Sequence, residues 1–303
     1  MTRPSIAIIG AGRLGSSLAQ QLARSGYGVV EIVSRGNSQA ARRLARQLKA
    51  RAYTLENAGL NARVVWFCVP DSVIAGCAAR LKNRDWRGKV AFHSSGVLTS
   101  DALQVLARQG AKLASVHPLM TFVRDSSPDL KGVAFALEGE RHAVGVAARI
   151  VRDLGGEALL LKRTEKVAYH AFATMICPLL LSLLTAAEAV AAKAGLAGTK
   201  TRRLASPIID ETLANYRNLG PARSFTGPIA RGDLATVSRH LKLLTKIPAG
   251  LGAYLGLAQA ALKYLPSANR MKLESLLKQA ASETAGRSLT GTGLASRRAS
   301  ARR

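Results

Sequence analysis

The chain has 303 residues, of which 48% are hydrophobic, and it carries a formal net charge of +26. This length fits two domains better than one, and the hydrophobic fraction excludes a globally disordered chain. The three cysteines are far apart, which excludes a disulfide scaffold and a cysteine-rich zinc site. The N-terminus reads as a strand and not as a signal peptide. We therefore expect a cytoplasmic globular protein without a metal centre.

The positive charge is spread over the whole chain. The net charge is +13 for residues 1–163, +8 for residues 164–283 and +5 for residues 284–303. A spread excess favours anionic ligands, but no nucleic-acid-binding motif accompanies it. We expect a small-molecule substrate and no specific nucleic-acid partner. The last of these segments is rich in Ala, Ser, Gly and Arg, a composition typical of a disordered basic tail.

Strand-like and helix-like segments alternate through the first half of the chain. The predicted strands cover residues 5–9, 29–33, 63–69, 89–93, 112–116, 133–137 and 158–161. The predicted helices cover residues 14–24, 38–49, 72–82, 101–109 and 143–154. Such alternation predicts an α/β domain with a doubly wound, mostly parallel sheet at residues 1–163. From residue 164 to 283 only helices are expected, which predicts an all-α domain for substrate binding or dimerisation.

An apolar stretch without formal charge runs from His170 to Ala187. Its length lies at the lower limit of a membrane span. Pro178 interrupts the stretch and Glu188 ends it, so we expect a helix packed in the second domain or in a homodimer interface. A membrane span is the weaker alternative.

The strongest chemical signal is a glycine-rich turn between the first predicted strand and the first predicted helix. The first glycine of such a turn allows a tight bend, the second lets a pyrophosphate approach, and the third allows close helix packing. The helix N-terminus then offers unpaired N–H groups to the phosphates. A turn without a ligand is the weaker alternative. The predicted cofactor-binding residues of this turn are Gly10, Gly12, Arg13, Leu14 and Gly15.

The second predicted strand ends in Ser34 and Arg35. Sites that prefer NAD carry an acidic residue at this place, which binds the ribose 2′-hydroxyl. A hydroxyl beside a guanidinium suits a 2′-phosphate instead, because arginine offers a planar fork of donors. The sequence therefore predicts NADP as the cofactor.

Further polar residues follow other predicted strands, where ligands of open α/β sheets bind. Val69 ends the third predicted strand and Pro70 follows it, and the Ser94–Gly96 turn (Ser94, Ser95 and Gly96) follows the fourth. We expect them beside the nicotinamide. His93 and His117 also fall at strand ends, and each is either a site residue or a structural histidine.

The helical half offers candidates for a proton donor and for an anion-binding group. Lys166 and His170 are four residues apart and share a helix face. A partly desolvated lysine has a lowered pKa that suits acid–base work, whereas a pair on the helix surface would have no role. Arg231 is a candidate for binding a substrate carboxylate.

Several of these motifs together resemble an uncharacterised Rossmann-like family. Its second half is a helical domain of unknown function, similar to the C-terminal domain of 6-phosphogluconate dehydrogenase. The resemblance spans residues 4–283 and is carried by GAGRLG (10–15), SR (34–35), VPD (69–71), FHSSG (92–96), SVHPL (115–119), FALEG (135–139), KVAYH (166–170) and TGPIARGD (226–233).

The wider superfamily includes ketopantoate reductase, 3-hydroxyacid dehydrogenases, pyrroline-5-carboxylate reductase and prephenate dehydrogenase. In the first two, the matching helix carries a catalytic lysine and an asparagine four residues later. Lys166 matches the lysine, whereas His170 replaces the asparagine. The His-Pro of SVHPL is similar to a substrate-contacting motif of prephenate dehydrogenases, which adds His117. The resemblance thus implies catalytic roles for Lys166 and His117, whereas the departure at His170 leaves the substrate class open. His170 stays a catalytic candidate because it shares a helix face with Lys166.

The function expected from the residues and the resemblance is that of an NADP-dependent oxidoreductase. It would transfer a hydride between NADP(H) and a small, anionic keto, hydroxy or imino acid. The alternative is a non-catalytic NADP-binding redox sensor or interaction protein, which would use the same glycine turn. A homodimer is expected by analogy only.

Overall fold

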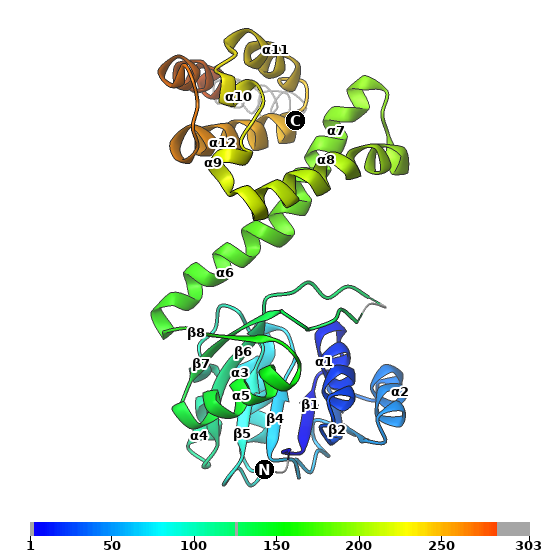
Figure 1. The fold of residues 1–303 in the computed structure, drawn as a ribbon. Coiled ribbons are helices and arrows are strands. Elements are labelled where there is room, and N and C mark those ends of the chain that lie inside the picture. The colour runs from blue at the N-terminus through cyan, green and yellow to red at the C-terminus, as the bar shows by residue number, and fades with distance from the viewer. Residues whose placement is uncertain (1–2, 125–126, 284–303) are drawn as a thin grey trace, which may run out of the picture. The chain divides into compact units, whose positions relative to one another are not determined.

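The computed structural model describes residues 3–124 and 127–283. The chain divides into two compact units, Met1–Cys177 and Pro178–Arg303 (Figure 1). The predicted basic tail at residues 284–303 lies outside the described residues. The predicted domain boundary after residue 163 differs from this division, because the next helix packs Lys166 and Tyr169 in the first unit, where both are buried.

The first unit contains an eight-stranded sheet with the order β3-β2-β1-β4-β5-β6-β7-β8. Neighbouring strands are parallel except for β6 and β7, which are antiparallel. The predicted fold class, a doubly wound and mostly parallel sheet followed by helices, is therefore confirmed. The strands are β1 (Ile6–Ile9), β2 (Val29–Ser34), β3 (Arg51–Thr54), β4 (Val64–Phe67), β5 (Val90–His93), β6 (Lys112–Pro118), β7 (Ala134–Gly139) and β8 (Glu157–Leu160).

Helices cover both faces of the sheet because side chains alternate along each strand. In β1, Ile6 and Ile8 belong to one buried cluster, and Ala7 and Ile9 to another. The first cluster includes residues of α1 (Arg13–Arg24), α2 (Gln39–Gln47) and α5 (Arg141–Asp153). The second includes residues of α3 (Asp71–Leu81), the 3-10 helix η1 (Ser100–Leu103) and α4 (Gln104–Ala107).

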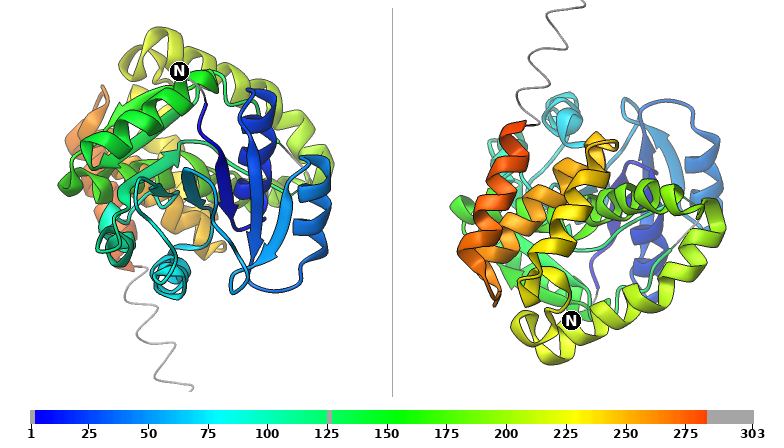
Figure 2. Two further views of the ribbon diagram at one scale, coloured as in Figure 1. Left: turned by 90° about the horizontal axis from the view of Figure 1, so that it is seen from below. Right: turned by 90° about the horizontal axis from the view of Figure 1, so that it is seen from above.

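Strand β3 was not among the predicted strands. It lies at the edge of the sheet and pairs only with β2. Arg51 and Ala52 are exposed, so the segment lacks the buried apolar run that identifies the central strands. Figure 2 shows α2 (lighter blue) beside this edge of the sheet.

The helix that enters the second unit starts in the first. It comprises the 3-10 helix η2 (Arg163–Glu165), α6 (Lys166–Thr174), a π-helical turn at Met175–Leu179, α7 (Leu180–Ala191) and the 3-10 helix η4 (Ala192–Ala194). Pro178 lies in the π-helical turn, as expected where a residue without an N–H interrupts the ladder.

The second unit is helical throughout its described part. Its buried cluster is formed mainly by leucines, including Leu241, Leu244, Leu251 and Leu273. Its further helices include α8 (Gly198–Leu219), α9 (Pro221–Ser224), α10 (Pro228–Arg231), α11 (Leu234–Leu244) and α12 (Pro248–Tyr264), and residues 270–283 are helical as well.

The apolar stretch from His170 to Ala187 is helical, but it is not buried. The helix Arg163–Ala194 is long and apolar enough to cross a membrane by length and composition, and 0% of its most apolar window is buried. Met175 and Leu181 are 66% and 65% exposed. The expectation of a buried central helix of the second domain is therefore wrong for this segment of the described chain, whereas packing in a dimer interface stays a prediction. Part of the stretch still contacts the second unit, because α7 packs against α12 and Leu183 and Ala187 line a pocket there with Leu244.

Candidate functional site

The glycine turn between β1 and α1 has the geometry that the sequence predicts. Gly10 has a φ of +105°, and a Cβ there would lie 2.5 Å from the carbonyl oxygen of Cys68. A Cβ on Gly15 would clash with the carbonyl oxygen of Gly10, so only glycine lets α1 pack this closely. At Gly12, by contrast, a Cβ would meet nothing within 4 Å. The backbone is therefore open where a pyrophosphate would approach.

The residues after β2 surround a pocket of about 210 Å³. Ser34 and Arg42 both line it, together with residues from the end of β3. The Ser34 hydroxyl donates to the carbonyl oxygen of Gly36 (2.7 Å), whereas Arg35 is exposed and does not line this pocket. Arg42, on α2, donates to the side-chain oxygen of Asn37. Arg42 was not among the predicted site residues, although its place on the helix after the second strand is a signal for phosphate binding.

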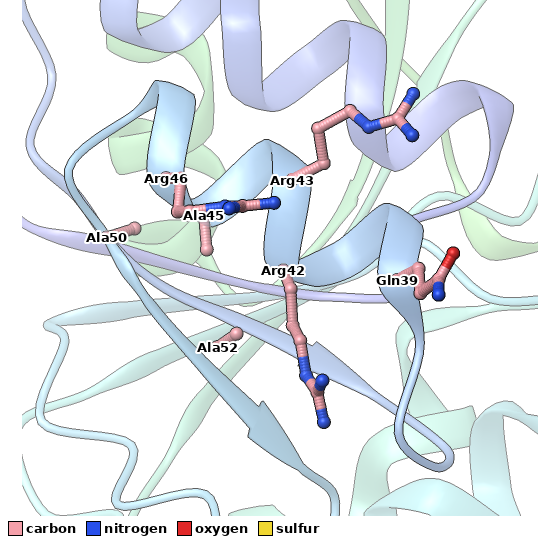
Figure 3. A pocket seen from close by; sticks show the side chains of 7 residues that line it. All are labelled: Gln39, Arg42, Arg43, Ala45, Arg46, Ala50 and Ala52. Atoms are coloured by element: carbon pink, nitrogen blue, oxygen red, sulfur yellow. The ribbon is translucent and has the colours of Figure 1, made fainter.

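A second, larger pocket of about 610 Å³ lies between α2 and the edge strand (Figure 3). Three arginines of one helix, Arg42, Arg43 and Arg46, line it, and Arg42 also lines the smaller pocket. Arg42 is therefore the basic side chain that joins the two pockets. This part of the surface suits an anionic group.

The Ser94–Gly96 turn follows β5 and is fixed by hydrogen bonds. The Trp66 indole N–H donates to the Ser94 hydroxyl (2.8 Å), and the Ser95 hydroxyl donates to a carboxylate oxygen of Asp71 (2.7 Å). His93 is fully buried. The Ser95 N–H donates to its Nδ1 (3.2 Å), so its Nε2–H donates to the carbonyl oxygen of Thr99 (2.9 Å). His93 is therefore a structural histidine that shapes this turn.

Lys166, the first residue of α6, is fully buried under the same turn. Its ammonium group donates to the Ser115 hydroxyl (2.6 Å) and to the Ser95 carbonyl oxygen (3.2 Å). Burial lowers its pKa to about 8, although the carboxylates of Glu138 and Asp71 act in the opposite direction. Lys166 therefore holds a desolvated charge beneath the turn.

His117, Tyr169 and His170 meet beside Gly96. His117 Nδ1 lies 2.8 Å from the hydroxyl oxygen of Tyr169, and the two histidine rings are 6.1 Å apart, nearly perpendicular. A Cβ on Gly96 would lie 2.5 Å from His170 Cδ2 and 3.0 Å from His117 Nε2. A glycine is therefore required where both imidazoles approach the backbone.

Two of these side chains have shifted pKa values. Burial lowers the pKa of His117 to about 4, and the positive charge of Lys166 acts in the same direction. Burial also raises the pKa of Tyr169 to about 12. At neutral pH, His117 is therefore a neutral imidazole and Tyr169 a neutral phenol.

The structure thus brings Lys166, His170 and His117 to one end of the sheet, around the Ser94–Gly96 turn. Tyr169 belongs to this cluster as well. The sequence analysis quoted it within a motif but gave it no role, although its spacing from Lys166 places both on one helix face. Arg231 is an exposed residue of the second unit, at the end of α10. Its role in substrate binding stays a prediction.

The cluster can orient and protonate a small polar molecule. It offers two imidazoles, a phenol and an ammonium group, which are hydrogen-bond donors near neutral pH. Pro70 and Asp71 begin α3 at the neighbouring strand end, and Val69 approaches Gly10. Over residues 3–124 and 127–283, no group of His, Cys, Asp and Glu has an arrangement suited to a metal ion.

Fold and strand-end geometry define a Rossmann-like protein with a helical second part. Residues 1–118 match the Rossmann-like domain family, and residues 133–261 match a domain of unknown function (DUF2520). The two matches together cover most of the chain, and they confirm the resemblance to a Rossmann-like family with a helical second domain of unknown function. Among curated proteins, none matches this chain.

Solved structures share the fold over most of the chain. A protein from Bacteroides fragilis assigned as an NADP oxidoreductase is 24% identical, with a TM-score of 0.73, covering 85% of this chain and 97% of its own. A protein from Thermotoga maritima is also 24% identical, with a TM-score of 0.67, covering 84% and 96%. A reductive aminase from Aspergillus terreus, solved with NADPH and ethyl-5-oxohexanoate, is 17% identical, with a TM-score of 0.61, covering 86% and 94%.

Proposed function

We propose that the protein is an NADP-dependent oxidoreductase that acts on a small keto, hydroxy or imino acid. The observation that carries the proposal is the pairing of an open glycine turn with a cluster of proton-donating side chains. Gly12 leaves the α1 N-terminus open, and His117 and His170 face the turn at Gly96. Both features lie at the carboxyl ends of sheet strands, where open α/β sheets bind ligands. Similar structures are described as NADP or NADPH proteins.

The residues of the first unit fit the parts of the cofactor. The N–H groups at the start of α1, with Gly10, Arg13 and Leu14, would hold the pyrophosphate. Ser34, Arg35 and Arg42 would hold the 2′-phosphate; the Ser34 hydroxyl must then turn from the Gly36 carbonyl oxygen, to which it now donates. The residues proposed beside the nicotinamide are Val69, Pro70, Ser94, Ser95 and Gly96.

The bound cofactor supplies a hydride, and the chain supplies the proton. In the reductive direction a carbonyl carbon gains a C–H bond, its C=O π bond breaks, and its oxygen gains a proton. His170 is the half-exposed candidate for the proton donor, and His117 is the neighbouring group that orients the oxygen. Lys166 supplies positive charge from beneath the turn, which favours an anionic substrate.

The first test is a fluorescence titration of the full chain with NADPH and, separately, with NADH. Micromolar binding of NADPH with much weaker binding of NADH supports the cofactor assignment. Consumption of NADPH is then followed with a panel of keto and imino acids. If NADPH binds and no panel member turns over, the non-catalytic redox sensor becomes the better interpretation. If neither cofactor binds, the oxidoreductase proposal fails.

We also propose a cytoplasmic homodimer that binds neither a membrane nor a specific nucleic acid. The support for the dimer is the row of exposed apolar side chains at Phe172, Met175, Ile176 and Leu179, for which a second copy is the proposed partner. Sedimentation of the full chain tests the dimer. A monomer at micromolar concentration, or partition into detergent or lipid, contradicts it.

A further inference from the structure

The first unit holds a histidine–tyrosine pair whose hydrogen bond has a defined direction. His117 lies in β6 and Tyr169 in α6, and they are joined by the 2.8 Å contact between Nδ1 and Oη. Their rings meet edge to face, with centroids 5.6 Å apart. Either atom is able to donate in principle, so the environment of each group decides which one carries the proton.

The environment favours the phenol as the donor. Tyr169 is 8% exposed, and its hydroxyl has no other acceptor among the described residues. If Nδ1 donated instead, the phenol proton would be buried without an acceptor, which is costly. The O–H group of Tyr169 therefore donates to Nδ1, and the proton of the neutral imidazole is on Nε2.

The proton on Nε2 is on the side of the proposed substrate site. Nε2 has no hydrogen-bond partner in the part of the chain that the structure describes, and it is the imidazole atom that faces Gly96. The ring of His170 closes the same corner, because its Cδ2 is the nearest atom to a Cβ built on Gly96. A ligand atom above the Ser94–Gly96 turn therefore meets an N–H donor.

We propose that Tyr169 is a positioning residue that fixes His117 as the Nε2–H tautomer, so that the site binds a hydrogen-bond acceptor, the oxygen of a carbonyl substrate. This inference rests on the proposed function for its substrate, but its structural part stands without it. His117 holds the oxygen, because a neutral imidazole that lost its Nε2 proton would become an anion. The proton that completes the reduction comes from His170 as an imidazolium, which becomes a neutral imidazole.

The same geometry disfavours an iminium substrate. A protonated iminium nitrogen has no lone pair and cannot accept a hydrogen bond from Nε2–H. The positive charge of Lys166 and the carboxylate of Asp71 act on His117 in opposite directions, so the missing acceptor on the iminium nitrogen decides the preference. The proposed site therefore selects a keto acid over an iminium ion, although several proteins with a similar fold are imine reductases.

The test is ¹⁵N NMR of the full chain labelled at its five histidines. The variant H117Q assigns the His117 signals. Between about pH 6 and about pH 8 we expect an unprotonated Nδ1 and a protonated Nε2 in the wild type. In Tyr169→Phe we expect both nitrogens to shift toward a mixture of tautomers, because the donor to Nδ1 is gone. A wild type with a protonated Nδ1, or a tautomer unchanged in Tyr169→Phe, overturns the proposal.

The chain provides a matched control. His240 and Tyr254 form a similar pair in the second unit, with 3.2 Å between Nδ1 and Oη. Tyr254→Phe should shift the His240 signals and leave those of His117 unchanged. An equal change at His117 in both variants would mean a general loss of structure, and it would overturn the assignment of the effect to Tyr169.

Cofactor and turnover measurements separate this inference from the proposed function. Tyr169→Phe should leave the Kd for NADPH within about twofold. It should lower kcat/KM for a keto acid about tenfold, because the variant loses the one hydrogen bond that orients His117. The tautomer is measured without cofactor, so failure to bind NADPH refutes only the proposed function. A cyclic iminium that turns over faster than every keto acid overturns the substrate assignment.

Discussion

The two histidine–tyrosine pairs have nearly the same geometry in very different surroundings. The His117–Tyr169 rings are 5.6 Å apart at 84°, and the His240–Tyr254 rings are 5.9 Å apart at 83°. The first pair lies beside the ammonium group of Lys166 and a second imidazole. The second pair lies in a pocket of about 490 Å³ whose other lining residues are mainly Leu, Ala and Val.

The difference shows that the surroundings, not the pair, give an imidazole its chemical role. The charge of Lys166 and burial both lower the pKa of His117. In the second unit the hydrogen bond between His240 and Tyr254 links α11 to α12 beside a mainly apolar pocket. We therefore expect the pair in the first unit to take part in ligand binding and the pair in the second unit to contribute to packing.

The largest effect is expected at Gly15. Gly15→Ala places a Cβ against the carbonyl oxygen of Gly10, so α1 must move away from the sheet. We expect a destabilisation of several kcal/mol, on the order of the larger overpacking costs, and loss of NADPH binding. Thermal unfolding and the fluorescence titration measure both.

Two other glycines serve as controls for Gly15. A Cβ on Gly252, in α12, would meet nothing within 4 Å, so Gly252→Ala should keep or raise stability by up to about 1 kcal/mol. Gly12→Ala should keep the Tm, because its surroundings are open as well, but lower the affinity for NADPH. Equal losses of stability in all three variants would contradict the assignment of a packing role to Gly15 alone.

The buried charge of Lys166 should appear in the pH dependence of stability. Its pKa is about 8 in the fold, below the ordinary value of 10.5. Between these two values the unfolded chain binds more protons, so stability rises with pH, by on the order of 1–3 kcal/mol. Lys166→Met should remove this rise. A wild-type unfolding free energy that falls between about pH 8 and about pH 10 would contradict the lowered pKa.

The sheet was more predictable than the cluster at its end. Alternating buried runs identify the central strands, because a parallel sheet covered on both faces needs apolar residues throughout. Strand β3 has no such run, since an edge strand has one neighbour and exposed side chains. The glycine turn was predictable because each of its three glycines meets a backbone requirement, and all three lie within six consecutive residues.

The cluster depends on contacts between distant segments. His117 and Tyr169 are 52 residues apart, and their hydrogen bond exists only because β6 and α6 meet. The burial of Lys166 has the same origin, since its two acceptors belong to β6 and to the turn after β5. The exposure of the apolar window in the helix Arg163–Ala194 also could not be predicted from its composition, which is equally typical of a core helix.

A smaller effect is expected at Arg42. Arg42→Ala should weaken NADPH binding by about 1–2 kcal/mol and leave NADH binding unchanged, because only NADPH carries the 2′-phosphate. Arg46→Ala is the matched control, since Arg46 lines only the larger of the two pockets beside α2. Equal losses for both variants would indicate a general effect of surface charge, which added salt would screen.

The smallest effect is expected from Tyr254→Phe in the second unit. The variant removes a 3.2 Å hydrogen bond to His240 from a half-buried site, which should cost about 0.5–1.5 kcal/mol of stability. Because the rest of the surrounding pocket is mainly apolar, the loss should change neither NADPH binding nor turnover. If Tyr254→Phe lowered kcat/KM as much as Tyr169→Phe does, the two pairs would share a chemical role. The contrast between a reactive first unit and a packing second unit would then be wrong.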